Sequence, residues 1–130
     1  MDEYQELCKK VYERLGWETE YTHEISNGVC VLKKHEVHMI YRKNHPENTY
    51  FAAYDTDYVL GKLPPVIQEN GKFLQLVIHA NGDSTFHLAY MEPYDKEFRG
   101  SYITNATSLR SALLKLTLAL ADTGLLEKEG

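Results

Sequence analysis

Apolar side chains near the start of the chain recur every three or four positions, which is the spacing of one face of a helix. They are Tyr4, Leu7, Cys8, Val11 and Leu15. Asp2 stands where a helix cap is expected, and Glu3 and Glu6 place negative charge where the helix dipole favours it. Gly16 is suited to the left-handed conformation that ends many helices. The pattern predicts a helix between Asp2 and Gly16.

The hydrophobic pattern is weaker between Glu18 and Asn48. A turn at Ser26-Asn27-Gly28 followed by Val29-Cys30-Val31-Leu32 predicts a short strand. A second strand is predicted over residues 37–41, where Val37, Met39 and Tyr41 alternate with other side chains. The stretch from Lys33 to Glu36 would then connect these two strands as a hairpin.

A second helix is predicted to begin near Asp55, with Asp55 or Thr56 as its cap. Its inner face would carry Tyr58, Val59, Leu60 and Leu63. Pro64-Pro65 should break this helix, because proline is not tolerated in a helix interior. A short turn through Gln68 would follow, and Asn70-Gly71 would close the segment.

The stretches from Phe73 to Ala80 and from Ser84 to Tyr90 flank Asn81-Gly82-Asp83 and predict a β-hairpin. A two-residue turn would leave each face of the hairpin half apolar and half polar. A three-residue loop that pairs Ala80 with Ser84 separates the two kinds of side chain, so we expect that register. One face then carries the apolar residues Leu74, Leu76, Ile78, Phe86, Leu88 and Tyr90. The opposite face carries Gln75, Val77, His79, Thr85, His87 and Ala89.

The end of the chain predicts a further strand from Phe98 to Ile103 and then a largely buried helix. Asn105 or Thr107 would cap this helix and Gly124 would end it. Its apolar stripe comprises Leu109, Ala112, Leu113, Leu116 and Leu120. Together these elements predict an α+β fold, in which an antiparallel sheet packs with two or three helices as an α/β sandwich. With no repeat or linker in the pattern, we expect a single domain over residues 1–130.

Composition and charge narrow the class of protein. The chain has 130 residues, a formal net charge of −5 and 43% hydrophobic residues, as an ordinary soluble domain has. General nucleic-acid binding is not expected, because it needs a basic surface. No apolar run is long enough to span a membrane, and no secretory signal is recognisable. Cys8 and Cys30 lie in apolar patterns and form no Cys-x-x-Cys pair, which favours buried thiols in a reducing compartment.

Two segments resemble a known family. Tyr54-Asp55-Thr56-Asp57-Tyr58-Val59-Leu60, at the start of a predicted helix, and Ala106-Thr107-Ser108-Leu109-Arg110-Ser111-Ala112-Leu113-Leu114 are similar to segments of the phage ABA sandwich proteins. The resemblance covers roughly residues 50 to 125. It implies an α/β sandwich of bacteriophage or prophage origin that acts in the cytoplasm of the bacterial host, and it brings no catalytic residues with it.

The histidines offer the clearest candidate chemistry. His79 and His87 share one face of the predicted hairpin. They lie diagonally across from each other, with their backbones about 7 Å apart. A third ligand from His23, His38 or Asp95 would complete a metal site. The alternative, which we favour, is a solvated or partner-facing sheet surface. Asp55-Thr56-Asp57 could likewise offer two carboxylates to a metal, although a helix cap explains the same residues.

Tyrosine is enriched, with 10 residues in the chain, and it suits interfaces because its ring is large and its hydroxyl is polar. No nucleophile elbow or phosphate-binding loop is recognisable. We therefore expect a non-enzymatic phage or prophage accessory protein, without a cofactor, that binds a host protein or a small host ligand, with counter-defence as one purpose. The expected binding residues are His79, His87, Gln75, Thr85, Tyr54 and Tyr94.

Three other possibilities stay open from the sequence. A small metal-dependent enzyme would use His79, His87 and Asp95. An acidic inhibitor that imitates DNA is a weaker hypothesis, because 19 acidic against 14 basic residues is a mild excess. A sheet edge or the tyrosine-rich segments could also join two copies of the chain as a homo-oligomer.

Overall fold

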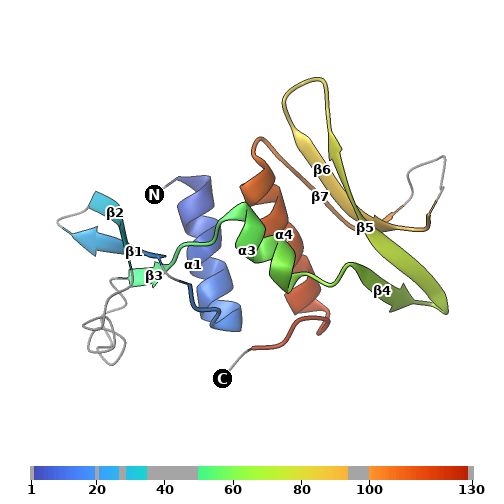
Figure 1. The fold of residues 1–130 in the computed structure, drawn as a ribbon, viewed down its shortest axis with the longest axis horizontal. Coiled ribbons are helices and arrows are strands. Elements are labelled where there is room, and N and C mark those ends of the chain that lie inside the picture. Colours follow the sequence, from blue (N-terminus) through green and yellow to red (C-terminus); the bar gives the residue numbers. More distant parts are fainter. Residues whose placement is uncertain (1, 20, 27–28, 35–49, 94–99, 129–130) are drawn as a thin grey trace. The chain divides into compact units, whose positions relative to one another are not determined.

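The computed structural model describes the chain apart from residues 1, 20, 27–28, 35–49, 94–99 and 129–130 (Figure 1). The described residues form three helices and two antiparallel sheets, so the predicted α+β class is confirmed. The chain divides into two compact units, Met1–Tyr54 with Glu127–Gly130, and Asp55–Leu126. Each unit has its own sheet, and the single domain stays a prediction. None of the helices in the described ranges is long and apolar enough to cross a membrane.

The first unit begins with the predicted helix, α1 (Glu3–Leu15). The Asp2 side chain accepts a hydrogen bond from the backbone of Gln5, and the Gln5 side chain accepts one from the backbone of Asp2. This reciprocal pair is a capping box, which satisfies two N–H groups that the helix itself cannot use. Gly16 ends the helix with φ at 69°, as predicted.

The same unit holds a three-stranded sheet of β1 (Tyr21–Ser26), β2 (Val29–Lys34) and β3 (Tyr50–Ala52), in the order β2-β1-β3. The predicted strand at Val29 is confirmed, but it continues through Lys34, so the connection expected from Lys33 was placed too early. The strand expected over residues 37–41 lies outside the described residues. Cys30 is half-buried rather than buried, and its burial raises the pKa of the thiol.

Strand β1 was not predicted, because its buried side chains are polar. Thr22, His23 and Glu24 are all buried, and the His23 ring contacts the rings of Tyr4 and Phe51. A run of polar residues gives no apolar alternation from which a strand could be inferred. The apolar core of the unit comprises Leu7, Cys8, Val11, Leu15, Trp17, Phe51, Ala52, Ala53 and Tyr54.

The second unit opens with α3 (Thr56–Lys62), which Asp55 caps by accepting a hydrogen bond from Tyr58 at 2.8 Å. The helix ends before Pro64, as predicted. Of the four expected inner residues only Val59 and Leu63 are buried, whereas Tyr58 and Leu60 are half-buried.

The turn expected through Gln68 was wrong, because a strand, β4 (Val66–Glu69), lies there. Asn70 and Gly71 have φ values of 53° and 77° and connect β4 to the next strand as a tight two-residue turn. Four residues are too few to show an alternating pattern, so only pairing with the neighbouring strand identifies β4.

The predicted hairpin consists of β5 (Lys72–Ala80) and β6 (Phe86–Met91). Ala80 pairs with Phe86 rather than Ser84, so the predicted register is wrong by two residues. The side chains nevertheless keep their predicted faces, because a strand alternates with a period of two and a shift of two changes no face.

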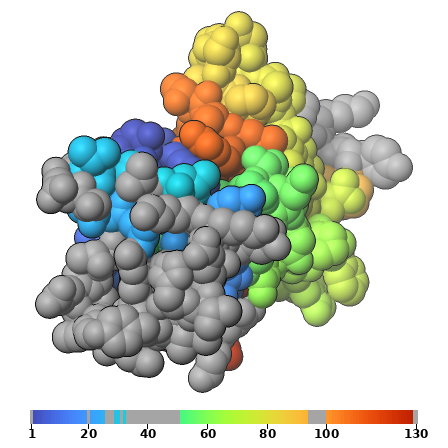
Figure 2. Space-filling model, turned by 60° about the vertical axis from the view of Figure 1, so that its left-hand side comes forward, coloured from blue at the N-terminus to red at the C-terminus, as the bar shows by residue number. Residues whose placement is uncertain are grey.

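The loop of this hairpin has the predicted length but a different position. The backbone N–H of Asn81 donates to the carbonyl of Thr85 at 2.8 Å, which encloses Gly82, Asp83 and Ser84. Ser84 has φ at 67° and takes the left-handed position that a three-residue hairpin loop requires. The loop forms a protruding tip, coloured yellow in Figure 2.

The last elements are β7 (Gly100–Ala106) and α4 (Leu109–Asp122). Neither expected cap is correct, because the strand continues through Asn105 and Ser108 caps the helix by accepting from Ser111 at 3.2 Å. The helix is largely buried, as predicted. Phe98, the expected start of the strand, lies outside the described residues.

The four-stranded sheet has the order β4-β5-β6-β7, and its two faces differ. Thr104 on β7 donates a hydrogen bond to the carbonyl of Ala112, so α4 packs on the face that Thr104 shares with its pairing partner Leu88. We call this the inner face, and it includes Leu74, Leu88, Tyr90, Ser101 and Thr104. The other face, which we call the open face, includes Val66, Phe73, Gln75, Val77, His79, His87, Ala89, Met91 and Ile103.

Candidate functional site

The open face presents large apolar side chains to solvent. Phe73 is 65% exposed, Ile103 is 53% exposed and Val66 is 49% exposed, and they lie on β5, β7 and β4 respectively. Their placement on one face follows from the strand register, because each pairs or alternates with residues of the same side. Large apolar side chains exposed on one sheet face can mark an interaction site.

His79 and His87 lie opposite each other in the ladder between β5 and β6. The prediction placed them on a diagonal, and the two-residue shift in register brings them into direct opposition. Side chains at opposed positions have Cβ atoms roughly 4.5–5.5 Å apart, so the two imidazoles are close neighbours. His79 is exposed and His87 is half-buried.

A hollow of about 230 Å³ lies in the open face beside the two histidines. Its most buried lining residues are Ala89 and Met91, which are 1% and 4% exposed. The remaining lining residues are Val77, His79, Asn81 and His87. The lining of the hollow thus combines buried apolar side chains with imidazole and amide groups.

Of the other expected binding residues, none that the structure describes lines this hollow. Gln75 is on the open face opposite Met91, and Thr85 closes the hairpin loop, with its hydroxyl donating to Asp83 at 2.6 Å. Tyr54 is in the first unit, wholly buried, with its hydroxyl donating to the Trp17 carbonyl at 2.7 Å. Tyr94 lies outside the described residues.

Of the three candidate third metal ligands, the structure describes only His23. Asp95 and His38 lie outside the described residues, and His23 is a buried residue of β1 in the first unit. Within the described ranges, no three His, Cys, Asp or Glu side chains are grouped so that they could hold a metal ion. Asp55 acts as the cap of α3, as the simpler interpretation predicted.

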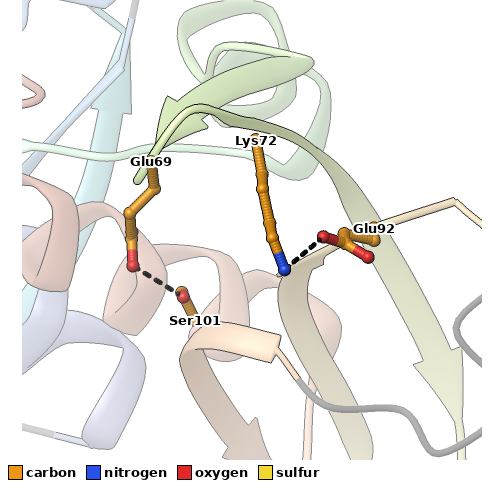
Figure 3. Close-up of polar contacts among 4 residues, drawn as sticks. All are labelled: Glu69, Lys72, Glu92 and Ser101. Atoms are coloured by element: carbon orange, nitrogen blue, oxygen red, sulfur yellow. Dashed lines mark hydrogen bonds and ion pairs between the residues drawn. The ribbon is translucent and has the colours of Figure 1, made fainter.

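The structure adds a second candidate site that the sequence did not indicate, a cleft of about 340 Å³ on the inner face. Two polar contacts cross it (Figure 3): the Ser101 hydroxyl donates to Glu69 Oε1 at 3.1 Å, and Lys72 Nζ lies 3.0 Å from Glu92 Oε1. The other lining residues are Asn70, Leu74, Tyr90 and Gly100.

The curvature of the sheet creates this cleft. Glu69 and Ser101 belong to β4 and β7, which are the two edge strands. In a flat sheet these edges would be three strand spacings, roughly 14 Å, apart, too far for a glutamate and a serine side chain to meet. Since their side chains are hydrogen bonded, the sheet must curve so that the β4–β5 hairpin closes over the inner face.

A backbone irregularity lies next to the cleft. Leu88 pairs with Thr104 and Tyr90 with Ser101, so Ala89 alone opposes two residues of β7 in a β-bulge. One of the two is Tyr102, whose φ of 58° is unusual for a bulky side chain and costs roughly 1–2 kcal/mol. Bulges of this kind often occur beside functional sites, where they redirect a side chain.

The residues of the cleft could not have been found by local pattern. The Asn70-Gly71 turn was predicted, but Glu69 and Ser101 are 32 residues apart in the chain and meet only through the curvature of the sheet. Comparison of this chain with protein-family models, curated proteins and solved structures found no match.

Proposed function

We propose that this chain is a non-enzymatic binding protein whose open face docks onto a protein partner. The observation that carries the proposal is the group of exposed apolar side chains, Val66, Phe73 and Ile103, on the sheet face that α4 does not cover. A partner that covers this face would remove those side chains from water, which is the main driving force of protein association.

The hollow beside the histidines would receive one side chain of the partner. Its lining by Ala89 and Met91 suits an aliphatic or aromatic group, and its volume of about 230 Å³ accommodates one such side chain. His79 and His87 in the same lining can donate or accept hydrogen bonds, which would fix the orientation of the partner. In this proposal His79 and His87 have the binding role predicted from the sequence, whereas Tyr54 is wholly buried in the first unit and is not part of the surface.

The resemblance to phage ABA sandwich proteins suggests the class of partner. A phage or prophage accessory protein acting in the bacterial cytoplasm would bind a host protein, with counter-defence as one purpose. The apolar character of the open face favours a protein over a small host ligand, because a small ligand would fill the hollow and leave Phe73 exposed.

The test uses the double variant His79→Ala/His87→Ala. A host partner is first isolated with the full chain and purified, and its affinity is then measured by titration calorimetry. We expect the double variant to weaken binding by roughly tenfold or more. Its melting temperature should stay unchanged, because His79 is exposed and His87 is half-buried.

The matched control is Lys10→Ala/Glu13→Ala, two exposed residues on α1 in the first unit. The control should bind as the original chain does. Equal affinity of the histidine variant and the original chain would exclude the open face as the docking surface. Native mass spectrometry of the same samples shows whether a small molecule or a second copy of the chain is bound instead of the partner protein.

The second candidate function is a small metal-dependent enzyme using His79, His87 and Asp95. The direct opposition of the two imidazoles favours it, because neighbouring imidazoles can bind one transition-metal ion. Metal analysis of the purified protein provides the test. Less than about a tenth of an equivalent of zinc, copper, nickel or iron would exclude this function.

A further inference from the structure

His79 and His87 together have the chemistry of half a transition-metal site. They oppose each other in the ladder between β5 and β6, and both line the hollow in the open face. His79 is exposed and His87 is half-buried, so an ion in solvent can reach the pair. Imidazole nitrogen is a preferred ligand of zinc, copper and nickel, and opposed strand positions hold two such groups close enough to share one ion.

Two imidazoles supply only half of a closed coordination shell. Zinc in a structural site takes four ligands in a tetrahedron. Within the described part of the chain, no third His, Cys, Asp or Glu side chain is grouped with the two histidines. The other polar residue of the hollow is Asn81, and its amide nitrogen already donates to Thr85 Oγ1 at 2.9 Å. Water or a second molecule would have to fill the other two positions.

The charges of the sheet favour a second copy of this chain as that molecule. Among the described strand residues, those on the open face include no Asp, Glu, Lys or Arg, whereas Glu69 and Lys72 belong to the inner face. Two copies with a net charge of −5 each repel one another, but the described side chains of two facing open faces add nothing to that repulsion. The same face also carries the exposed apolar residues Val66, Phe73 and Ile103.

Two-fold symmetry would complete the coordination shell. In a symmetric dimer the same surface of each copy meets the other, so an axis through the metal ion brings both histidine pairs to it. Four imidazoles then form the tetrahedral shell that zinc prefers. Each copy holds an incomplete site, and the second copy supplies the missing half.

We propose that one divalent transition-metal ion, with zinc as the probe, joins two copies of the chain through His79 and His87 of each, with the open faces together. Such a dimer covers the surface that the proposed function assigns to a protein partner, so the ion regulates docking. That regulatory consequence rests on the proposed function, whereas the metal-linked dimer does not. Unlike the metal-dependent enzyme considered above, this site needs no Asp95 and leaves no coordination position for a substrate.

The experiment is sedimentation equilibrium and native mass spectrometry of the full chain, first with a chelator and then with zinc. At roughly 50 µM chain we expect a monomer with the chelator, and with zinc a dimer that holds one ion per two chains. Magnesium and calcium should leave the chain monomeric, because these ions prefer oxygen ligands. A dimer that persists with the chelator, or one zinc ion per chain without a dimer, overturns the proposal.

His79→Gln and His87→Gln test the ligands, because glutamine keeps a polar side chain and lacks the imidazole nitrogen. Loss of a residue that merely supports a ligand costs roughly 10–100-fold in metal affinity, so loss of a ligand should weaken the zinc-linked dimer by about a hundredfold or more. The matched control is Gln75→Ala, an exposed residue of the same face outside the hollow, which should dimerise as the original chain does. Undiminished zinc-dependent dimerisation in both histidine variants overturns the proposal.

Cobalt(II) gives a second measurement, which reports the coordination number in the original chain and does not depend on a variant folding. Tetrahedral cobalt(II) absorbs visible light far more strongly than the octahedral ion does, and it replaces zinc in tetrahedral sites. We expect the strong tetrahedral bands to appear together with the dimer. Weak octahedral bands would show that water fills the remaining positions, which contradicts the shared site.

Partner binding separates failure of this inference from failure of the proposed function. With the chelator present, the host partner should bind the original chain, and added zinc should weaken that binding by roughly tenfold or more. Partner binding that zinc leaves unchanged contradicts the regulation and leaves the docking face standing. A zinc-linked dimer that needs both histidines, in a chain whose open face docks no host protein, supports the metal site and contradicts the proposed function.

Discussion

Tyr90 connects the packing of the inner face to the shape of the cleft. Its side chain is fully buried, its hydroxyl donates to the Pro64 carbonyl, and its ring meets that of Tyr102 edge to face at 6.4 Å. Burial raises the pKa of Tyr90 to about 12, because the phenolate would lose its hydration in this position. The hydroxyl therefore stays protonated at neutral pH and keeps Pro64 at the base of β4.

The raised pKa of Tyr90 predicts a loss of stability in alkali. An unfolded tyrosine titrates near pH 10, whereas the folded group titrates at about 12. Between these values the unfolded chain has lost a proton that the folded chain retains, so the free energy of unfolding should fall as pH rises. Urea unfolding from pH 9 to 12 measures this.

Tyr90→Phe is the control for that measurement. It should be less stable at pH 7 by roughly 1–2 kcal/mol, because the Pro64 carbonyl loses its donor. Between pH 10 and about 12 it should lose less stability than the original chain does. Parallel pH profiles for the two proteins would show that Tyr90 has an ordinary pKa.

At the scale of elements, the paired strands β6 and β7 contribute residues to both candidate sites. The strands come together at Gly100, where an added Cβ would lie 2.8 Å from the Ala89 Cβ and 3.0 Å from the Met91 Cγ. Ala89 and Met91 line the hollow in the open face, and Gly100 and its neighbour Ser101 line the inner-face cleft. Close approach at this one glycine thus shapes both surfaces.

Gly100→Ala should therefore destabilise the second unit by about 1–3 kcal/mol, the cost of overpacking at a position without free space. Thermal unfolding followed by circular dichroism measures the effect. Gly82→Ala is the matched control, because nothing lies within 4 Å of a Cβ added there and its φ is not in the left-handed region. A melting temperature of Gly100→Ala equal to that of Gly82→Ala would contradict the close approach of β6 and β7.

At the scale of the whole molecule, each of the two units contains buried apolar side chains of its own. Leu113, Leu114, Leu116 and Leu120 on α4 are fully buried in the second unit, and the core of the first unit centres on Val11, Leu15 and Trp17. A unit with its own buried apolar side chains can lose its packing by itself. The single domain expected from the sequence would instead unfold as one cooperative body.

Leu113→Ala distinguishes these two behaviours, because removing a fully buried leucine costs about 2–5 kcal/mol. We expect the amides of α4 and β6 to exchange faster, by a factor that corresponds to the free energy of unfolding lost. The amides of α1 should keep their protection. Hydrogen exchange followed by NMR measures both sets. An equal loss of protection in α1 would show that the chain unfolds as a single domain.

Local sequence patterns were sufficient to predict the three helices and the faces to which the hairpin side chains belong. The capping box at Asp2 and the cap at Asp55 involve residues within one turn, so they can be inferred without knowledge of the rest of the chain. The assignment of His79 and His87 to one face needed only the alternation of a strand. These features depend on neighbours in sequence, and the sequence by itself determined them.

Only the tertiary structure decided the features that depend on residues far apart in the chain. The register of β5 and β6 differs from the prediction by two residues, a change that leaves the alternation of faces intact and is therefore invisible in the pattern. Strand β1 is buried through polar side chains, and Glu69 meets Ser101 only because the sheet curves. Periodicity encodes which side of an element is buried, whereas long-range packing decides what that side meets.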